Sequence, residues 1–367
     1  EYKSGYTKGT IGVGVDAFGY AGFKLDSGKG RANQTGSIVG LLPANDQGEP
    51  EDSYGEAGAA LKLRISATEL KYGQMRTAAP VFATGDAFLL PETATGFLAT
   101  SSELNNLVLE AGHFTAFNDY NSSNSDGELK PAYGSGKPGS SISFGGGSFT
   151  GVDNLTLMFY GSHFEDSWNQ YFVNANYGIP LSESQKLVFD LNVYRTMDTG
   201  ASYQGDINNT ASSLKASYIF DIHTFDLAQQ HVHGDTPFDY VGWDSIWLAN
   251  SNQFSDFNGP GEEATSLAYT IDLAECVAPG LTAMAKYTKG TDIDGTHADP
   301  TGGYAGYYGN DGAHWERDFD IKYVVQSGAA KDLAIRLRQA THRGNSDQGD
   351  GAIDELRLSF TYPWELL

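Results

Sequence analysis

The sequence predicts an all-β protein: one transmembrane antiparallel β-barrel of about 18 strands that takes up residues 1–367 as a single domain. Apolar and polar residues alternate with a period of two in segment after segment, which is typical of strands with two unlike faces. These segments are about 8 to 12 residues long, and a tilted strand crosses a bilayer with about 9–11 residues. Glycine is abundant (45 residues), aromatic residues make up 13% and charged residues only 19%, which argues against a helical bundle or a disordered chain.

The alternation begins near the N-terminus and continues to the end of the chain. In 11–25, apolar residues favour the odd-numbered positions from Ile11 onward, and in 61–66 three aliphatic residues alternate with Lys62 and Arg64. Clusters of Gly, Asn, Asp, Ser and Pro separate the periodic segments, as turns and loops require. The same period predicts further strands at 155–159, 187–193, 214–222, 267–273, 281–287, 319–325, 333–338 and 356–362.

A soluble β-sandwich alternates in the same way, so it is the alternative to a barrel in lipid. Three features favour the barrel. The apolar faces often end in aromatic pairs such as Tyr218 with Phe220 and Phe360 with Tyr362, which suits the aromatic girdles at membrane interfaces. The polar faces carry charges that a packed core would not tolerate. At about 20 residues for each strand and its connection, the chain holds roughly 16 to 18 strands, enough to enclose a water channel.

Nine basic residues lie on the polar side of the expected strands. On the lipid side each would cost about 2–4 kcal/mol near the bilayer midplane, so we expect them in the lumen. There they would concentrate anions, and each Arg would bind a carboxylate with two hydrogen bonds. The alternative is that they pair with lumenal carboxylates such as Asp190, Asp221, Asp272 and Asp320 and only hold the wall together. The nine are Lys24, Lys62, Arg64, Lys215, Lys286, Lys322, Arg336, Arg338 and Arg357.

Two segments between strands are candidates for loops that fold into the lumen. Segment 77–96 is apolar and contains Pro91, which makes it a poor strand. Folding inward would bury it and narrow the pore; a lid over the outside is the alternative. We expect Asp86 and Phe88 at its tip, followed by Leu89. The aromatic stretch 237–261 is the second candidate.

Other kinds of chemistry find little support in the sequence. The net charge of −23 excludes nucleic acid as a main partner, because such binding depends on Lys and Arg. No apolar run approaches the 18 residues of a membrane-spanning helix. His231-Val-His233 places two imidazoles on one strand face without a third ligand at a set spacing. No nucleophile motif singles out a catalytic triad. We therefore expect no metal, no cofactor and no enzymatic activity.

Several ordered stretches make the chain similar to one known family. They include 4–10 (Ser-Gly-Tyr-Thr-Lys-Gly-Thr), 22–28, 61–66, 70–73, 88–93 (Phe-Leu-Leu-Pro-Glu-Thr), 235–242 (Asp-Thr-Pro-Phe-Asp-Tyr-Val-Gly), 248–261, 331–338 and 354–359. Together they resemble the OprD-type family of substrate-selective outer-membrane porins of pseudomonads. The likeness is spread over essentially the whole chain, which makes the set specific although each stretch alone is weak.

The resemblance implies a monomeric 18-stranded barrel in the bacterial outer membrane, narrowed by inward loops and lined along one wall by a ladder of Arg and Lys. Such a protein passes small carboxylate-bearing solutes, such as amino acids or aromatic acids, by passive diffusion. Two departures stand out. Family members begin with a further N-terminal strand, so we expect an odd number of strands here, and Phe88 stands where the inward loop usually carries Arg.

The leading hypothesis is therefore a selective channel for small organic anions or zwitterions, working as a monomer or a weakly associated oligomer. The alternative is a surface β-barrel with a closed lumen that binds or adheres through its loops. Acidic residues of the expected loops, among them Glu262, Glu263, Asp347 and Asp350, are interpreted as solvated groups that aid solubility. A divalent-cation link to lipopolysaccharide phosphates is the alternative role for them.

Overall fold

The computed structural model describes residues 1–25, 41–45 and 50–363, which form strands, turns and irregular segments. No helix within these residues is long and apolar enough to cross a membrane. The strands are β1 (Tyr2–Lys3), β2 (Ile11–Phe23), β3 (Ser53–Ile65), β4 (Thr68–Met75), β5 (Ala78–Ala79), β6 (Phe82–Ala83), β7 (Thr93–Leu104), β8 (Leu107–Asn118), β9 (Ile142–Val152), β10 (Leu155–Phe164), β11 (Trp168–Pro180), β12 (Gln185–Asp198), β13 (Asn208–Phe220), β14 (His223–His233), β15 (Glu263–Asp272), β16 (Leu281–Ile293), β17 (Gly312–Val324), β18 (Ala334–Gly344) and β19 (Ile353–Thr361).

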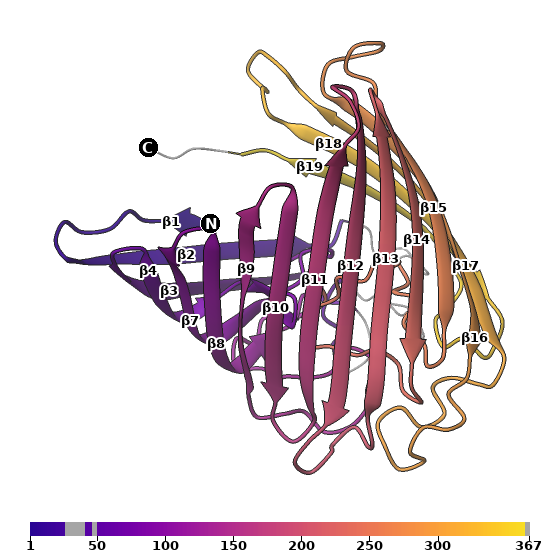
Figure 1. Cartoon of the computed structure of the whole chain (residues 1–367). Coiled ribbons are helices and arrows are strands. Elements are labelled where there is room, and N and C mark those ends of the chain that lie inside the picture. The colour runs from indigo at the N-terminus through magenta and orange to yellow at the C-terminus, as the bar shows by residue number, and fades with distance from the viewer. Residues whose placement is uncertain (26–40, 46–49, 364–367) are drawn as a thin grey trace.

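One antiparallel sheet of 17 strands dominates the described part of the chain. From β2 to β19 each strand pairs with the next one along the chain, except that β5 and β6 form a separate small hairpin between β4 and β7. The short strand β1 pairs with β2. The sheet curls into a deep trough (Figure 1). No residue register joins β19 to β2 within the described residues, so the curl stays open along that seam. The all-β antiparallel prediction is confirmed, with an odd number of strands in the sheet.

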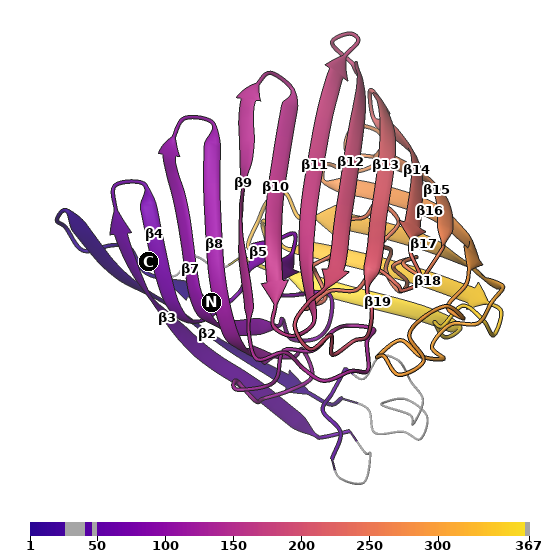
Figure 2. The same cartoon turned by 60° about the horizontal axis from the view of Figure 1, so that its bottom comes forward.

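The connections differ at the two rims of the sheet (Figure 2). One rim has tight turns in which Ser66, Asn106, Asn154 and Asp221 adopt positive φ values between 53° and 61°, as the reversal of a short hairpin requires. The long connections 76–92, 119–141, 234–262 and 294–311 all leave from the opposite rim, because consecutive antiparallel strands alternate in direction. Short turns at one rim and long loops at the other are typical of outer-membrane barrels.

The two faces of the sheet differ as the alternation predicts. Large apolar side chains such as Val13, Leu63 and Leu358 point outward and are exposed. On the inner face, polar side chains such as Asn174 and Asn192 are buried at 5% and 2% exposure. This apolar-out and polar-in arrangement is the reverse of a soluble sandwich and suits a wall between lipid and an aqueous interior.

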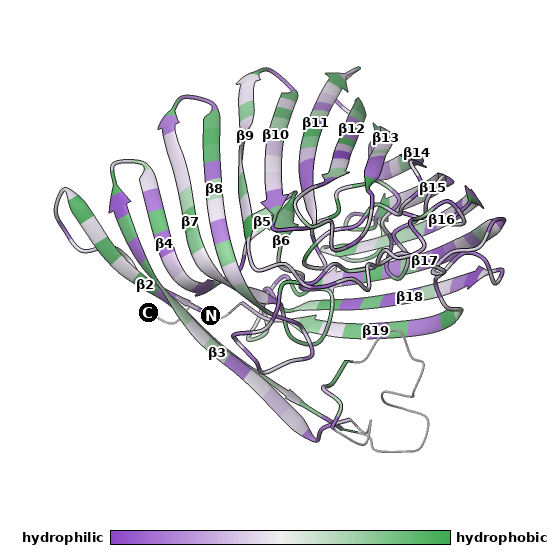
Figure 3. Ribbon diagram, turned by 90° about the horizontal axis from the view of Figure 1, so that it is seen from below, coloured by the Kyte–Doolittle hydropathy of each residue, from purple (hydrophilic) through white to green (hydrophobic). Residues whose placement is uncertain are grey.

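A buried apolar cluster fills part of the interior. It combines inward residues of strands β3 to β14 with side chains from the long connections, and it centres on aromatic residues such as Phe82, Phe114 and Phe144. Among the described residues, strands β15 to β19 contribute nothing to this inner apolar cluster. Hydropathy colouring shows the connections lying inside the trough (Figure 3). The interior is therefore packed on one side and lined by polar groups on the other.

Candidate functional site

The loop between β4 and β7 lies inside the trough and reaches the far wall. Its small hairpin, β5 with β6, places Phe82 at 0% exposure against Phe114 and Phe144 of strands β8 and β9, with ring centroids 5.2 Å and 6.3 Å away. Tyr194 of β12 donates a hydrogen bond of 3.0 Å to the carbonyl of Pro80. Strand β7 begins at Thr93, so the predicted segment 77–96 ends in a strand.

The turn after this hairpin is held by charged groups of its own connection and of β19. Asp86 is exposed and pairs with Arg76 at 2.9 Å. The guanidinium of Arg357 on β19 donates a 2.8 Å hydrogen bond to the carbonyl of Ala87. Phe88 stacks on Tyr120 with ring centroids 3.8 Å apart, because an exposed ring there would leave its apolar surface in water.

The next two residues of the turn point in different directions: Leu89 is 47% exposed and Pro91 is buried. Arg76 and Arg357 bring positive charge to the turn that carries Phe88.

Glu92 joins this loop to the connection between β14 and β15. Its carboxyl is fully buried, and one oxygen accepts the backbone N–H groups of Gly85 at 2.7 Å and Trp243 at 2.9 Å. The other oxygen has no hydrogen-bond partner among the described residues. Burial, reinforced by the negative charges of Asp119 and Asp244, raises the pKa of Glu92 to about 8.

The second predicted segment, 237–261, lies in the connection 234–262 and is also inside. Asp239 accepts the backbone N–H groups of Ala132, Tyr133 and Gly134 at 2.8–3.1 Å and the hydroxyl of Tyr304 at 3.0 Å. Burial raises the pKa of Asp239 to about 6, although these hydrogen bonds oppose the shift. Two further connections, 119–141 and 294–311, are thus fastened to the same interior group.

The nine predicted basic residues fall into paired and unpaired groups. Ion pairs hold Lys24 to Asp52 (2.6 Å), Lys62 to Asp16 (2.5 Å), Arg336 to Asp320 and Arg357 to Glu355. Lys286 donates to the carbonyl of Ala249 at 3.0 Å, and the guanidinium of Arg64 stacks 4.3 Å from the Tyr6 ring centroid. Lys215, Lys322 and Arg338 make no hydrogen bond or ion pair within the described part of the chain.

Strand register gathers four of the nine on one wall. Arg338 lies between Asp320 of β17 and Arg357 of β19, and Arg336 lies beside Lys322 of β17. We call Lys322, Arg336, Arg338 and Arg357 the basic wall. The other five lie on β3, β13 and β16 or just after β2. The Nε atom of Arg338 is buried without a hydrogen-bond partner.

A cavity of about 370 Å³ lies beside strands β1, β2 and β4. It is lined by cations and acids together, including Lys71, Arg76, Asp16, Glu110 and Asp244. The sequence reasoning missed Lys71 and Arg76. The inward direction of Lys71 could have been predicted from the sequence, because its neighbours Leu70 and Tyr72 are apolar and point outward on β4.

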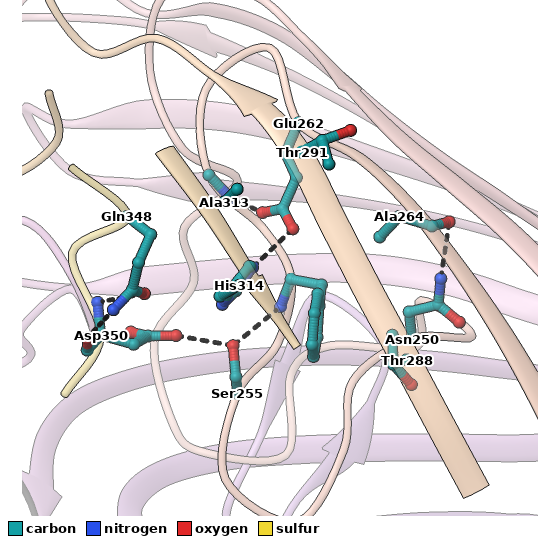
Figure 4. Close-up of polar contacts among 12 residues, drawn as sticks. Asn250, Ser255, Glu262, Ala264, Thr288, Thr291, Ala313, His314, Gln348 and Asp350 are labelled. Carbon is teal, nitrogen blue, oxygen red and sulfur yellow. Dashed lines mark hydrogen bonds and ion pairs between the residues drawn. The ribbon is translucent and has the colours of Figure 1, made fainter. Parts of the chain in front are cut away.

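Two acidic residues that we expected in solvent are instead drawn inward. Glu262 is 1% exposed and accepts a 2.7 Å hydrogen bond from His314. Asp350 accepts the hydroxyl of Ser255 at 2.6 Å, and burial raises its pKa to about 6. Both contacts are drawn in Figure 4. The solvated interpretation is wrong for these two, because their connections turn toward the lumen.

Known proteins similar to this chain agree on one family. A family model described as outer membrane porin, OprD family, matches residues 1–366. Porin D of Pseudomonas aeruginosa is 51% identical over 377 residues, which cover 100% of this chain and 84% of that protein. The crystal structure of OprD from Pseudomonas aeruginosa matches with a TM-score of 0.86 at 49% identity, covering 99% of this chain and 86% of that one.

A more distant solved relative is OpdK of Pseudomonas aeruginosa, whose structure with vanillate matches with a TM-score of 0.88 at 31% identity, covering 99% of this chain and 90% of that one. The barrel-like sheet, the apolar outer face, the inward connections and these relatives lead to the same assignment. The chain belongs to the OprD family and is a porin of the outer membrane.

Proposed function

We propose that this porin passes small carboxylate-bearing solutes, amino acids and aromatic or other organic acids, by passive diffusion, and that the basic wall guides them. The observation that carries the proposal is Arg338. Its neighbours Arg336 and Arg357 have carboxylate partners, whereas the guanidinium of Arg338 makes no hydrogen bond or ion pair within the described residues. A guanidinium with free donors is the group that binds a carboxylate with two parallel hydrogen bonds.

The surroundings of Arg338 support a weak and renewable contact. Arg336, Arg357 and Arg338 lie on neighbouring positions of β18 and β19, and the combined positive potential attracts anions to this wall. Conduction needs several moderate sites in sequence, because one tight site would trap the solute. Lys322, also unpaired, provides a further step along β17.

The loop 77–92 is proposed as the narrowing element of the pore. Its apolar hairpin is anchored in the inner apolar cluster, while Asp86 and Leu89 of the turn are exposed. Phe88 of this turn stacks on Tyr120, and Pro91 is buried. Arg357 contacts the turn through Ala87, so the basic wall and the narrowing element meet at one point. The connection 234–262 is proposed as a second element that limits the width.

The mixed cavity beside β4 favours solutes that carry both charges. Lys71 and Arg76 are suited to a carboxylate, while Glu110 and Asp244 are suited to an ammonium group. Vanillate, present in the OpdK structure, is an aromatic carboxylate, so both classes of solute fit the proposal. Membership in a porin family favours the channel over the adhesion alternative with a closed lumen.

Ion current through single proteins in a planar bilayer tests the proposal. In a salt gradient, the reversal potential reports anion against cation preference, and added benzoate or an amino acid should interrupt the current. Arg338→Gln should reduce the anion preference and weaken block by benzoate, because the free guanidinium is removed.

The matched control is Arg195→Gln, since Arg195 points outward on β12 and bonds Asn209 and Thr210 of the neighbouring strand. It should leave both quantities unchanged. Equal reversal potentials and equal block in Arg338→Gln and the unmodified protein would contradict a role of the basic wall.

A further inference from the structure

Two buried histidines face each other on the inner side of β17 and β18. His314 Nδ1 and His342 Nε2 are 2.8 Å apart, and the ring planes meet at 84°. Their exposures are 4% and 0%. Neighbouring strands bring them together although 28 positions separate them in the chain.

In each ring, the nitrogen that points away from the other histidine already has a hydrogen-bond acceptor. His342 Nδ1 lies 2.7 Å from the carbonyl oxygen of Gly351, which can only accept, so this nitrogen carries a proton. His314 Nε2 lies 2.7 Å from a carboxylate oxygen of Glu262. When that nitrogen also donates, each neutral ring has its proton on the outer side. The two nitrogens that face each other are then both lone pairs.

Two lone pairs at this distance repel unless both nitrogens bind a cation. A proton fits directly between them, whereas a zinc ion binds both once the rings move apart to about 3.3 Å. A carboxylate stands beside the pair: the ligand atoms of His314, His342 and Asp350 all lie within 4.8 Å of one another. One oxygen of Asp350 accepts the Ser255 hydroxyl, which leaves its second oxygen for another partner (Figure 4).

We propose that His314 Nδ1, His342 Nε2 and Asp350 bind one divalent transition-metal ion of the zinc type. Imidazole nitrogen with carboxylate oxygen suits zinc, copper or nickel, whereas calcium and magnesium require oxygen ligands throughout. Three protein ligands leave a fourth position for water. The outer contacts fit as well, because metal-bound histidines almost always donate their second N–H to a carboxylate or carbonyl, which orients the ring.

The ion would fasten an interior loop to the barrel wall. Glu262 and Ser255 belong to the connection 234–262, and Phe257 of the same connection packs 4.1 Å from the His314 ring centroid. Asp350 belongs to the connection after β18. Metal binding therefore ties two connections to β17 and β18 next to the basic wall. This site does not depend on the proposed choice of solute.

Zinc binding to the folded protein in detergent tests the site. The protein is stripped with a chelator, dialysed against limiting zinc, and its metal content is measured by mass spectrometry. Affinity is measured by competition with a chromophoric chelator. The unmodified protein should retain one zinc per chain, and cobalt in its place should give visible absorption bands that the stripped protein lacks.

Asp350→Asn keeps an acceptor for Ser255 and removes the charged ligand, and it should weaken zinc binding at least tenfold. His342→Ala should abolish binding. The control His297→Ala removes an exposed histidine that lies 3.4 Å from Asp294 and should change nothing. Folding of each variant is checked by heat-dependent gel mobility, and Asp350→Asn decides the matter if His342→Ala does not fold. The site would be overturned if the unmodified protein and Asp350→Asn retained equal amounts of zinc, or if neither retained any. The contact between the two rings would then be explained by a shared proton.

Discussion

We expect Glu92 to make the docking of the loop 77–92 dependent on pH. Its buried carboxyl holds the backbone N–H groups of Gly85 and Trp243, and its pKa is about 8 instead of the ordinary 4.5. When the loop undocks, the carboxyl meets water and its pKa returns toward the ordinary value. Between these two pKa values the docked state therefore holds one more proton than the undocked state.

The sign and size follow from linkage. The stability of the docked loop is fully present below about pH 4.5, falls as pH rises toward 8, and is level above that. The slope is about 1.4 kcal/mol per pH unit, so the equilibrium constant for undocking rises about tenfold per unit between about pH 5 and 7.5. The whole window corresponds to about 5 kcal/mol.

Glu92→Gln provides the comparison, because its amide oxygen accepts the same two N–H groups and carries no titrating proton. Hydrogen exchange of the Gly85 and Trp243 amides is measured in both proteins at each pH, so that the intrinsic pH dependence of exchange cancels. The ratio of the two exchange rates should increase about tenfold per pH unit from about pH 5 to 7.5. Amides of β11 serve as the internal control and should show no such trend. A ratio that is constant over this range would refute the reasoning.

Three further substitutions test other contacts of the interior. Phe82→Ala removes a fully buried ring from the inner apolar cluster, and we expect the free energy that holds the loop in place to fall by about 3–5 kcal/mol. The loss should be seen as faster hydrogen exchange of the β5 and β6 amides and as larger fluctuations of the open current. Asp16→Asn leaves the buried ammonium of Lys62 without its carboxylate at a cost of about 3–5 kcal/mol; the unfolding temperature in detergent should fall, and an unchanged value would speak against the ion pair. Arg357→Gln removes the hydrogen bond to Ala87 and the ion pair with Glu355, and it should raise fluctuations of the open current; unchanged fluctuations would speak against a contact between β19 and the turn.

The predicted strands all have a clear outward alternation, but β4, β7, β8 and β11 also lie outside the predicted segments. β11 was missed although its outward residues, such as Tyr171 and Tyr177, alternate regularly. β9 was missed because three consecutive glycines, residues 145–147, erase its pattern. β14 was missed because polar residues take over its C-terminal half. Strand polarity placed the basic residues on the inner face, since an alternating strand has only two sides. It did not reveal their partners, because pairs such as Lys62 with Asp16 depend on the register between neighbouring strands.

The inward loops were harder to predict because their anchors are remote. Asp239 binds the backbone of Ala132 and its neighbours more than a hundred positions away, and nothing in either segment indicates the other. Glu262 and Asp350 looked like ordinary loop acids for the same reason. His314 and His342 meet only because β17 and β18 are adjacent. The strand pattern suggests that these strands are neighbours, but it does not give the register that brings the two histidines together.

The apolar cluster fills only one side of the trough, and this affects the electric field in the remaining aqueous path. The inner apolar cluster is buried and lies against strands β3 to β14, while the fixed cations of the basic wall lie on β17 to β19. Field lines from those cations spread little into the apolar side, so they cross the remaining aqueous path sideways. A permeating zwitterion would therefore travel with its dipole turned across the pore, carboxylate toward β18, and its rotation would be hindered before any single contact forms.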